Sequence, residues 1–175
     1  MILQLLEQIT RALEQRGIDY MLSGSMALNS YTVPRMTLDA DIVIELSGKN
    51  LEDFFEIFEN EFYVNKDSVR EEVARSGMFN VIDHKTGFKV DFIVRKNTEY
   101  RILEFNRRRK ERIGNSEVWI VSPEDLVISK IEWIQQLKSD RQISDIENLL
   151  SIPAIDKNYV IDWCNKLKLN TFDLF

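Results

Sequence analysis

Three aspartates and a glycine–serine pair are the residues of this sequence whose types and spacing can support chemistry. Gly24-Ser25 follows a short apolar run, and Asp39-Ala40-Asp41 opens another. Residues two apart on a strand point to the same side, so Asp39 and Asp41 present two carboxylates together. Paired carboxylate oxygens suit a hard divalent cation such as Mg²⁺ or Mn²⁺. A glycine turn that opens a helix directs backbone N–H groups at an anion such as phosphate.

A third carboxylate, Asp91, lies in an apolar stretch, where an acidic residue is unusual and suggests a functional role. Its neighbours Val90 and Phe92 are expected to face the core, so Asp91 points to the other side. If its strand adjoins the strand of Asp39 and Asp41, Asp91 completes a metal site or acts as a general base. A phosphate cradle beside such a metal site is what metal-assisted phosphoryl transfer requires.

The elements that must position these residues follow an α/β order. Residues 1–121 are predicted to form the core that carries the site, and residues 122–175 a C-terminal helical extension packed on it. Hydrophobic periodicity and turn residues predict strands over 19–22, 39–46, 79–83, 88–94 and 118–121. They predict helices over 2–16, 26–31, 51–62, 67–75, 98–112, 123–138, 141–151 and 156–168.

Composition excludes several classes of protein. The chain has 175 residues, 44% hydrophobic and 30% charged, with a formal net charge of −6, which is poorly suited to sequence-blind binding of duplex DNA. A single cysteine, Cys164, and a single histidine, His84, exclude an intramolecular disulfide and a Cys/His zinc site. No run reaches the roughly 18 apolar residues of a membrane span, and the N-terminus does not read as a signal peptide, so we expect a cytoplasmic protein without membrane partners.

The spacing of Gly24-Ser25, Asp39-Ala40-Asp41 and Asp91 resembles the nucleotidyltransferase fold of the DNA polymerase β superfamily. The string from Arg35 through Thr37 to Asp41 is similar to the AbiEii-type toxin nucleotidyltransferases of type IV toxin–antitoxin systems, in a compact branch of that group. The resemblance implies an α+β fold, in which a mixed β-sheet with flanking helices is followed by a C-terminal helical tail.

The resemblance also implies an activity, namely transfer of a nucleoside monophosphate from an NTP to a hydroxyl of an unknown acceptor, which is RNA, a protein or a small molecule. Asp39, Asp41 and Asp91 would be the catalytic residues and would hold Mg²⁺ or Mn²⁺. The implied nucleotide-binding residues are Gly24, Ser25, Arg35, Thr37 and Lys130. Arg141 and Asp145 would contact and orient these residues without touching the nucleotide themselves.

Lys130 and the pair Arg141 and Asp145 each have a second interpretation. Lys130 falls on a helix face with Leu126, Trp133 and Leu137, so it either contacts phosphate or extends from the rim of the core. Arg141 and Asp145 are four residues apart and could form an ordinary helical ion pair.

The cationic run 107–112 is interpreted as a solvated helix face, with a platform for RNA as the alternative. Trp133 and Trp163 are predicted to lie in the core between the last helices.

Two other functions compete with the toxin-type enzyme. One is a non-catalytic nucleotide-binding or toxin–antitoxin partner module on the same fold, which would bind a protein antitoxin. The other is an antibiotic-modifying nucleotidyltransferase, for which an acidic cleft suited to a cationic drug would be the supporting feature.

Overall fold

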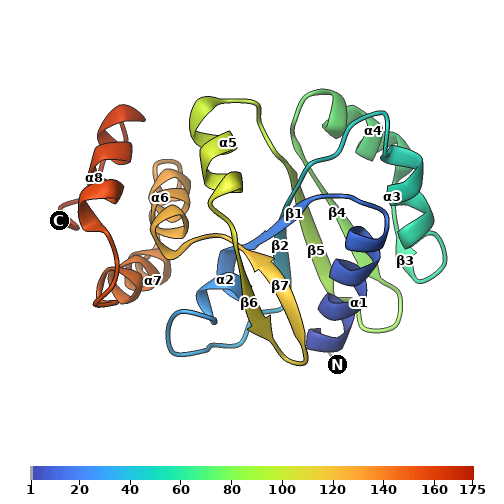
Figure 1. The fold of residues 1–175 in the computed structure, drawn as a ribbon, viewed down its shortest axis with the longest axis horizontal. Coiled ribbons are helices and arrows are strands. Elements are labelled where there is room, and N and C mark those ends of the chain that lie inside the picture. Colours follow the sequence, from blue (N-terminus) through green and yellow to red (C-terminus); the bar gives the residue numbers. More distant parts are fainter. Residues whose placement is uncertain (1) are drawn as a thin grey trace.

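A seven-stranded mixed sheet of order β3-β4-β5-β2-β1-β7-β6 lies at the centre of the computed structural model, which describes residues 2–175 (Figure 1). The strands are β1 (Tyr20–Ser23), β2 (Asp39–Ile44), β3 (Phe62–Tyr63), β4 (Met78–Asp83), β5 (Lys89–Val94), β6 (Arg109–Ile113) and β7 (Ser116–Ile120). The helices are α1 (Ile2–Gln15), α2 (Gly24–Leu28), α3 (Leu51–Phe58), α4 (Lys66–Ala74), α5 (Glu99–Asn106), α6 (Pro123–Ile134), α7 (Asp140–Leu150) and α8 (Lys157–Lys166). The predicted α/β class with a mixed sheet and flanking helices is confirmed.

Alternation along the central strands gives the sheet two different faces. In one register row, Leu22, Ile42 and Phe92 are fully buried and belong to the core under α1 and α3. The next row carries Asp41 and Asp91, which therefore point to the opposite face, the one on which Met21 and Val43 pack with the core of α6, α7 and α8. The fold thus separates an aromatic core from the face that bears the predicted chemistry.

Three predicted helices are too long, namely those expected over 51–62, 98–112 and 123–138, the last of which ends at Ile134. The helix expected over 51–62 ends at Phe58, and Phe62 pairs with Asp83 as part of β3. Phe62 still packs on Phe58, with ring centroids 5.0 Å apart, so its spacing along the sequence matched a helix although the backbone had already turned. The second overlong helix concerns the cationic run.

The cationic run 107–112 is not a helix face, so that interpretation is wrong. The helix expected over 98–112 ends at Asn106, and residues 109–113 form the edge strand β6, paired antiparallel with β7. The two-residue turn Gly114-Asn115 joins them, with Gly114 at φ +62°, a conformation that glycine adopts without strain. The other elements agree with the sequence prediction to within a few residues.

The last three helices form a second core with Met21, Ala27 and Leu28, which come from β1 and α2. Trp163 is buried there, as predicted, together with Cys164, but Trp133 is 60% exposed, so its predicted core position is wrong. Trp133 lies in the last turn of α6, and Leu137 beyond it is 73% exposed. Within residues 2–175, no helix is both long enough and apolar enough to cross a membrane.

Asp125 is the polar link that attaches these helices to one another. Its fully buried carboxylate accepts hydrogen bonds from the hydroxyls of Tyr100 (3.2 Å) and Tyr159 (2.8 Å), and from Nε of Arg107 (2.9 Å). The donors lie on α5, on the residue that follows α5 and on α8. The Asp125 side chain therefore links α6 to both α5 and α8.

We expect Asp125→Ala to lower the free energy of unfolding by about 2–4 kcal/mol, because it leaves buried hydroxyl donors without a partner. Urea denaturation measures the change. Asp162→Ala, at an exposed position of α8, is the matched control and should change stability by less than about 0.5 kcal/mol. Equal effects of the two substitutions would contradict this role for Asp125.

Candidate functional site

Gly24 lies directly against Asp41. It begins α2 immediately after β1, and its φ of +60° is a conformation that other residues rarely adopt. A Cβ atom at Gly24 would lie 1.8 Å from Oδ2 and 2.6 Å from Cγ of Asp41, so no other side chain fits. The predicted phosphate-binding turn and a predicted metal ligand are therefore in contact.

Asp91 adjoins the Asp39–Asp41 strand, as the sequence analysis required. β2 and β5 are parallel neighbours, with Asp41 opposite Asp91 and Asp39 opposite Lys89. Neighbouring strands lie about 4.8 Å apart, so the three carboxylates form one group on one face of the sheet. All three residues are half-buried.

Asp39 and Asp91 each have a partner within the chain. Thr37 Oγ1 donates to Oδ1 of Asp39 (2.9 Å), and Lys89 Nζ donates to Oδ2 of Asp91 (2.6 Å). The carboxylate of Asp41 makes no hydrogen bond with any of residues 2–175. Burial, together with repulsion from Asp39 and Asp91, raises the pKa of Asp41 to about 6.

Asp39, Asp41 and Asp91 have side chains of the right chemistry for a hard divalent cation, but they are not arranged as a closed metal site. The donors are all carboxylate oxygens, and the negative charge on Asp41 lacks a hydrogen-bonded counter-charge. Over residues 2–175, no group of three or more His, Cys, Asp or Glu side chains is closed into a metal site. The assignment of Asp39, Asp41 and Asp91 as metal ligands stays a prediction.

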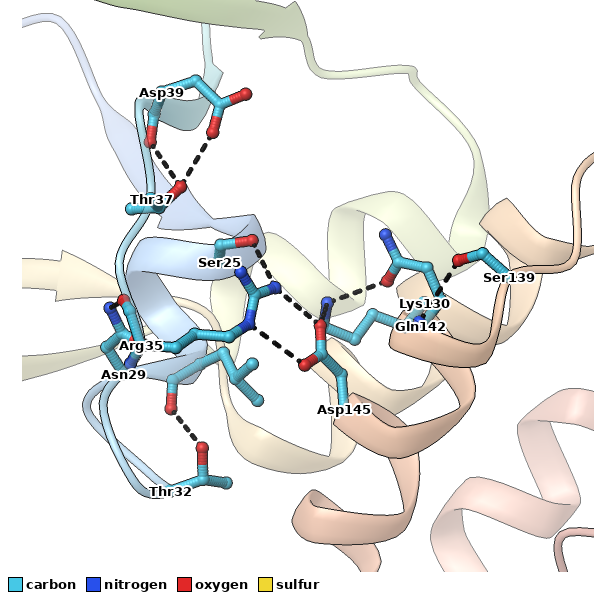
Figure 2. Close-up of polar contacts among 11 residues, drawn as sticks. Ser25, Asn29, Thr32, Arg35, Thr37, Asp39, Lys130, Ser139, Gln142 and Asp145 are labelled. Carbon is cyan, nitrogen blue, oxygen red and sulfur yellow. Dashed lines mark hydrogen bonds and ion pairs between the residues drawn. The ribbon is translucent and has the colours of Figure 1, made fainter.

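Arg35 lies between the turn at Ser25 and the C-terminal helix α7 (Figure 2). Its Nη2 donates to Ser25 Oγ (2.9 Å) and to Oδ2 of Asp145 (2.9 Å), and its Nε donates to Oδ1 of Asp145 (3.3 Å). The amide of Asn29 fixes the loop by bonding both backbone groups of Arg35, at 2.8 and 2.9 Å. Arg35 therefore lies beside Ser25 and is paired with Asp145, which is 110 residues away in the sequence.

Lys130 is buried, so the alternative of a lysine that extends from the rim of the core is wrong. Its Nζ donates to Asp145 Oδ2 (2.9 Å) and to Gln142 Oε1 (3.0 Å), and the residue is 6% exposed (Figure 2). Burial lowers the pKa of Lys130, against the opposing effect of Asp145. Burial alone would raise the pKa of Asp145, but hydrogen bonds from Arg35 and Lys130 lower it.

Arg141 and Asp145 do not form the helical ion pair that their spacing allowed. Arg141 is exposed and has no ion-pair partner among residues 2–175, whereas Asp145 is buried and shared by Arg35 and Lys130. Asp145 therefore supports both predicted nucleotide-binding cations, and Arg141 does not. Sequence reasoning missed Gln142, which lies one helical turn before Asp145 on the same face, and Lys89, two residues before Asp91 on the same side of β5.

Comparison with solved structures relates this arrangement to known proteins. The antibiotic-resistance factor ANT(2'')-Ia superposes with a TM-score of 0.67 and 12% identity over 95% of this chain and 90% of its own. The lincosamide antibiotic adenylyltransferase LnuA, bound to lincomycin, superposes with a TM-score of 0.58 and 13% identity over 84% of this chain and 95% of its own. An antigenic nucleotidyltransferase-like protein from Paracoccidioides brasiliensis superposes with a TM-score of 0.57 and 17% identity over 94% of this chain and 86% of its own. No protein-family model and no curated protein matches the sequence.

The chain has the nucleotidyltransferase fold. The fold implied by the resemblance of Gly24-Ser25 and the aspartates agrees with these neighbours, whereas a particular closeness to AbiEii-type toxins is not shown by them. Within the nucleotidyltransferase fold of this chain, the turn at Gly24, the acidic pair on β2 and Asp91 on β5 converge on one face.

Gly24→Ala and Gly17→Ala separate the cost of backbone conformation from the contact with Asp41. Both glycines have φ near +60°, but a Cβ at Gly17 would meet nothing within 4 Å. We expect Gly17→Ala to cost about 1–2 kcal/mol of stability. Gly24→Ala should cost more, because Asp41 must also move. Chemical denaturation measures both costs, and an equal loss of stability in the two variants would show that the contact with Asp41 is dispensable.

Proposed function

We propose that this protein is a Mg²⁺-dependent nucleotidyltransferase that moves a nucleoside monophosphate from an NTP to a hydroxyl acceptor and releases pyrophosphate. The observation that carries the proposal is the contact of Gly24 with Asp41, in the same register row as Asp91. It joins a turn suited to phosphate to a carboxylate group suited to a metal. Neighbours with this fold, antibiotic adenylyltransferases among them, support nucleotidyl transfer in general. Cytoplasm, where NTPs and Mg²⁺ are abundant, is the proposed location.

Asp39, Asp41 and Asp91 would hold the metal, which neutralises charge on the reacting phosphate when bound. Thr37 orients Asp39 through its hydroxyl. Asp91 accepts the proton of the acceptor hydroxyl as the acceptor oxygen bonds to the α-phosphorus and the bond to pyrophosphate breaks. The backbone at Gly24 and Ser25 binds phosphate oxygens.

Arg35 and Lys130 supply positive charge on the pyrophosphate side. Together they share one carboxylate, Asp145, so the cluster keeps one surplus positive charge beside Ser25. Arg35 Nη1 is buried and has no hydrogen-bond partner among residues 2–175. A surplus charge and an unpaired donor next to the turn are what a triphosphate oxygen would satisfy.

The acceptor side of the site lacks the cations that a nucleic acid would need. In-line transfer places the acceptor opposite the leaving pyrophosphate, and hence beyond Asp91 over β4. Asn80 lies opposite Asp91 there, and the exposed Tyr63 and Met78 flank it on β3 and β4. On this face of β3, β4 and β5, Lys89 is the one cation among the described residues. Phosphate contacts need Lys or Arg, so we favour a small hydroxylated molecule over RNA.

The charge of this face also favours the antibiotic-modifying alternative over the toxin-type one. Three carboxylates against one lysine suit a neutral or cationic acceptor. ANT(2'')-Ia, also solved with adenylyl-2''-tobramycin, and lincomycin-bound LnuA are neighbours whose names fit this alternative. A toxin role, an RNA or protein acceptor and a protein antitoxin stay predictions from the sequence resemblance. A non-catalytic module is less favoured, because all three aspartates are present and adjacent.

Asp41→Asn tests the proposed function. We expect transfer of label from an α-³²P-NTP to fall by at least about 100-fold, because the half-buried carboxylate next to the turn is lost. In metal-free buffer the same variant should melt a few degrees higher, because Asn removes a half-buried charge that two neighbours repel. Asp67→Asn, at an exposed position, is the control for both measurements. Undiminished transfer by Asp41→Asn would refute the proposed function.

Asn80→Ala tests the acceptor side. We expect kcat/KM for a hydroxylated small-molecule acceptor to fall about tenfold while the Kd for Mg·NTP is unchanged, since Asn80 lies beyond Asp91. Label transfer to a panel of glycosides and aminocyclitols, and to an oligoribonucleotide, provides the measurement. Arg112→Ala on β6 is the control for an RNA surface. Preferential labelling of the oligoribonucleotide, reduced by Arg112→Ala and not by Asn80→Ala, would reverse the assignment.

A further inference from the structure

Lys89 places an ammonium group inside the carboxylate cluster. It precedes Asp91 by two residues on β5, so both side chains point to the same face, and it lies opposite Asp39 in the register of β2 and β5. Its Nζ is 2.6 Å from Asp91 Oδ2. A lysine ammonium is a cation at neutral pH, and here it forms an ion pair with Asp91.

The two outer carboxylates are thus each held by a neighbour in the chain. Asp39 is bonded to Thr37 and Asp91 to Lys89, which leaves Asp41 between them without a partner. A divalent cation bound to Asp91 through Oδ2 would have to displace the Lys89 ammonium.

We propose that Lys89 is an internal counter-cation that competes with the divalent metal for Asp91, so that the metal binds weakly alone and tightly only together with the nucleotide. This inference rests on the proposed function. A triphosphate brings negative charge to the site, which favours the metal and compensates the ammonium that the metal displaces. Lys89 can leave, because its side chain is 41% exposed and flexible, whereas Asp91 is only 14% exposed and fixed on the strand.

The consequence is an order of events. Metal that arrives alone meets a carboxylate already paired with a cation, whereas Mg·NTP delivers metal and compensating anion together. Lys89 is therefore a positioning residue, acting through Asp91. Its effect belongs to metal affinity in the absence of nucleotide, a quantity that a merely structural lysine would not change.

Lys89→Met tests this inference through the Kd of Mn²⁺, measured by the electron paramagnetic resonance signal of free Mn²⁺ and by calorimetry. We expect Mn²⁺ alone to bind the variant about tenfold more tightly than the wild type, the scale of a charge-assisted pair that is partly exposed. The factor by which a non-hydrolysable NTP analogue strengthens Mn²⁺ binding should fall correspondingly. Lys89→Arg keeps the cation and should keep wild-type affinity.

Lys85→Met is the matched control, because Lys85 is an exposed lysine paired with Glu61 in the β4–β5 turn. An unchanged or weaker affinity of Lys89→Met for Mn²⁺ alone, with Mn²⁺ and the NTP analogue still binding the wild type together, would overturn the role of Lys89 and leave the proposed function standing. If neither protein bound Mn²⁺ even with the analogue, the proposed function would fail, and this inference with it.

Discussion

The contact between Asp41 and the backbone of Gly24 is the constraint on which the rest of the site depends. Asp41 is on a central strand, and the turn at Gly24 must close over its carboxylate without a Cβ in the way. That requirement fixes where α2 begins and directs Ser25 toward Arg35. A half-buried carboxylate repelled by two others is costly to keep, and the fold keeps it where a cation and a triphosphate would both relieve the cost.

The site also depends on the last third of the chain. Asp145 on α7 holds Arg35 from the α2–β2 loop and Lys130 from α6. Neither cation could stay so placed and so buried without that carboxylate, because an unpaired buried charge is destabilising. The C-terminal helices therefore position the two cations that are proposed to bind the nucleotide, and Asp125 in turn holds those helices against α5.

The sequence was sufficient to predict which residues share the face of the site, but not which side chains pair with one another there. Alternation predicted that Asp39 and Asp41 share a face, and β5 proved to be their neighbour because its apolar residues match theirs in register. No local pattern pairs Asp145 with Arg35, and its spacing from Arg141 suggested a different partner. The basic run failed as a helix because the Gly114 turn and pairing with β7, which are tertiary constraints, outweighed local helical propensity.

Charge is distributed unevenly along the register row of the site, and this asymmetry gives the proposed reaction a direction. At the Ser25 end, Arg35 and Lys130 outnumber Asp145, so developing negative charge is stabilised there. At the Asp91 end, carboxylates outnumber Lys89, so a proton is attracted and a polyanion is repelled. The cations of β6 lie at the opposite edge of the sheet from β3, and β7, β1 and β2 separate them from Asp91 on β5. A site polarised in this way suits an uncharged hydroxyl that enters at one end and pyrophosphate that leaves at the other.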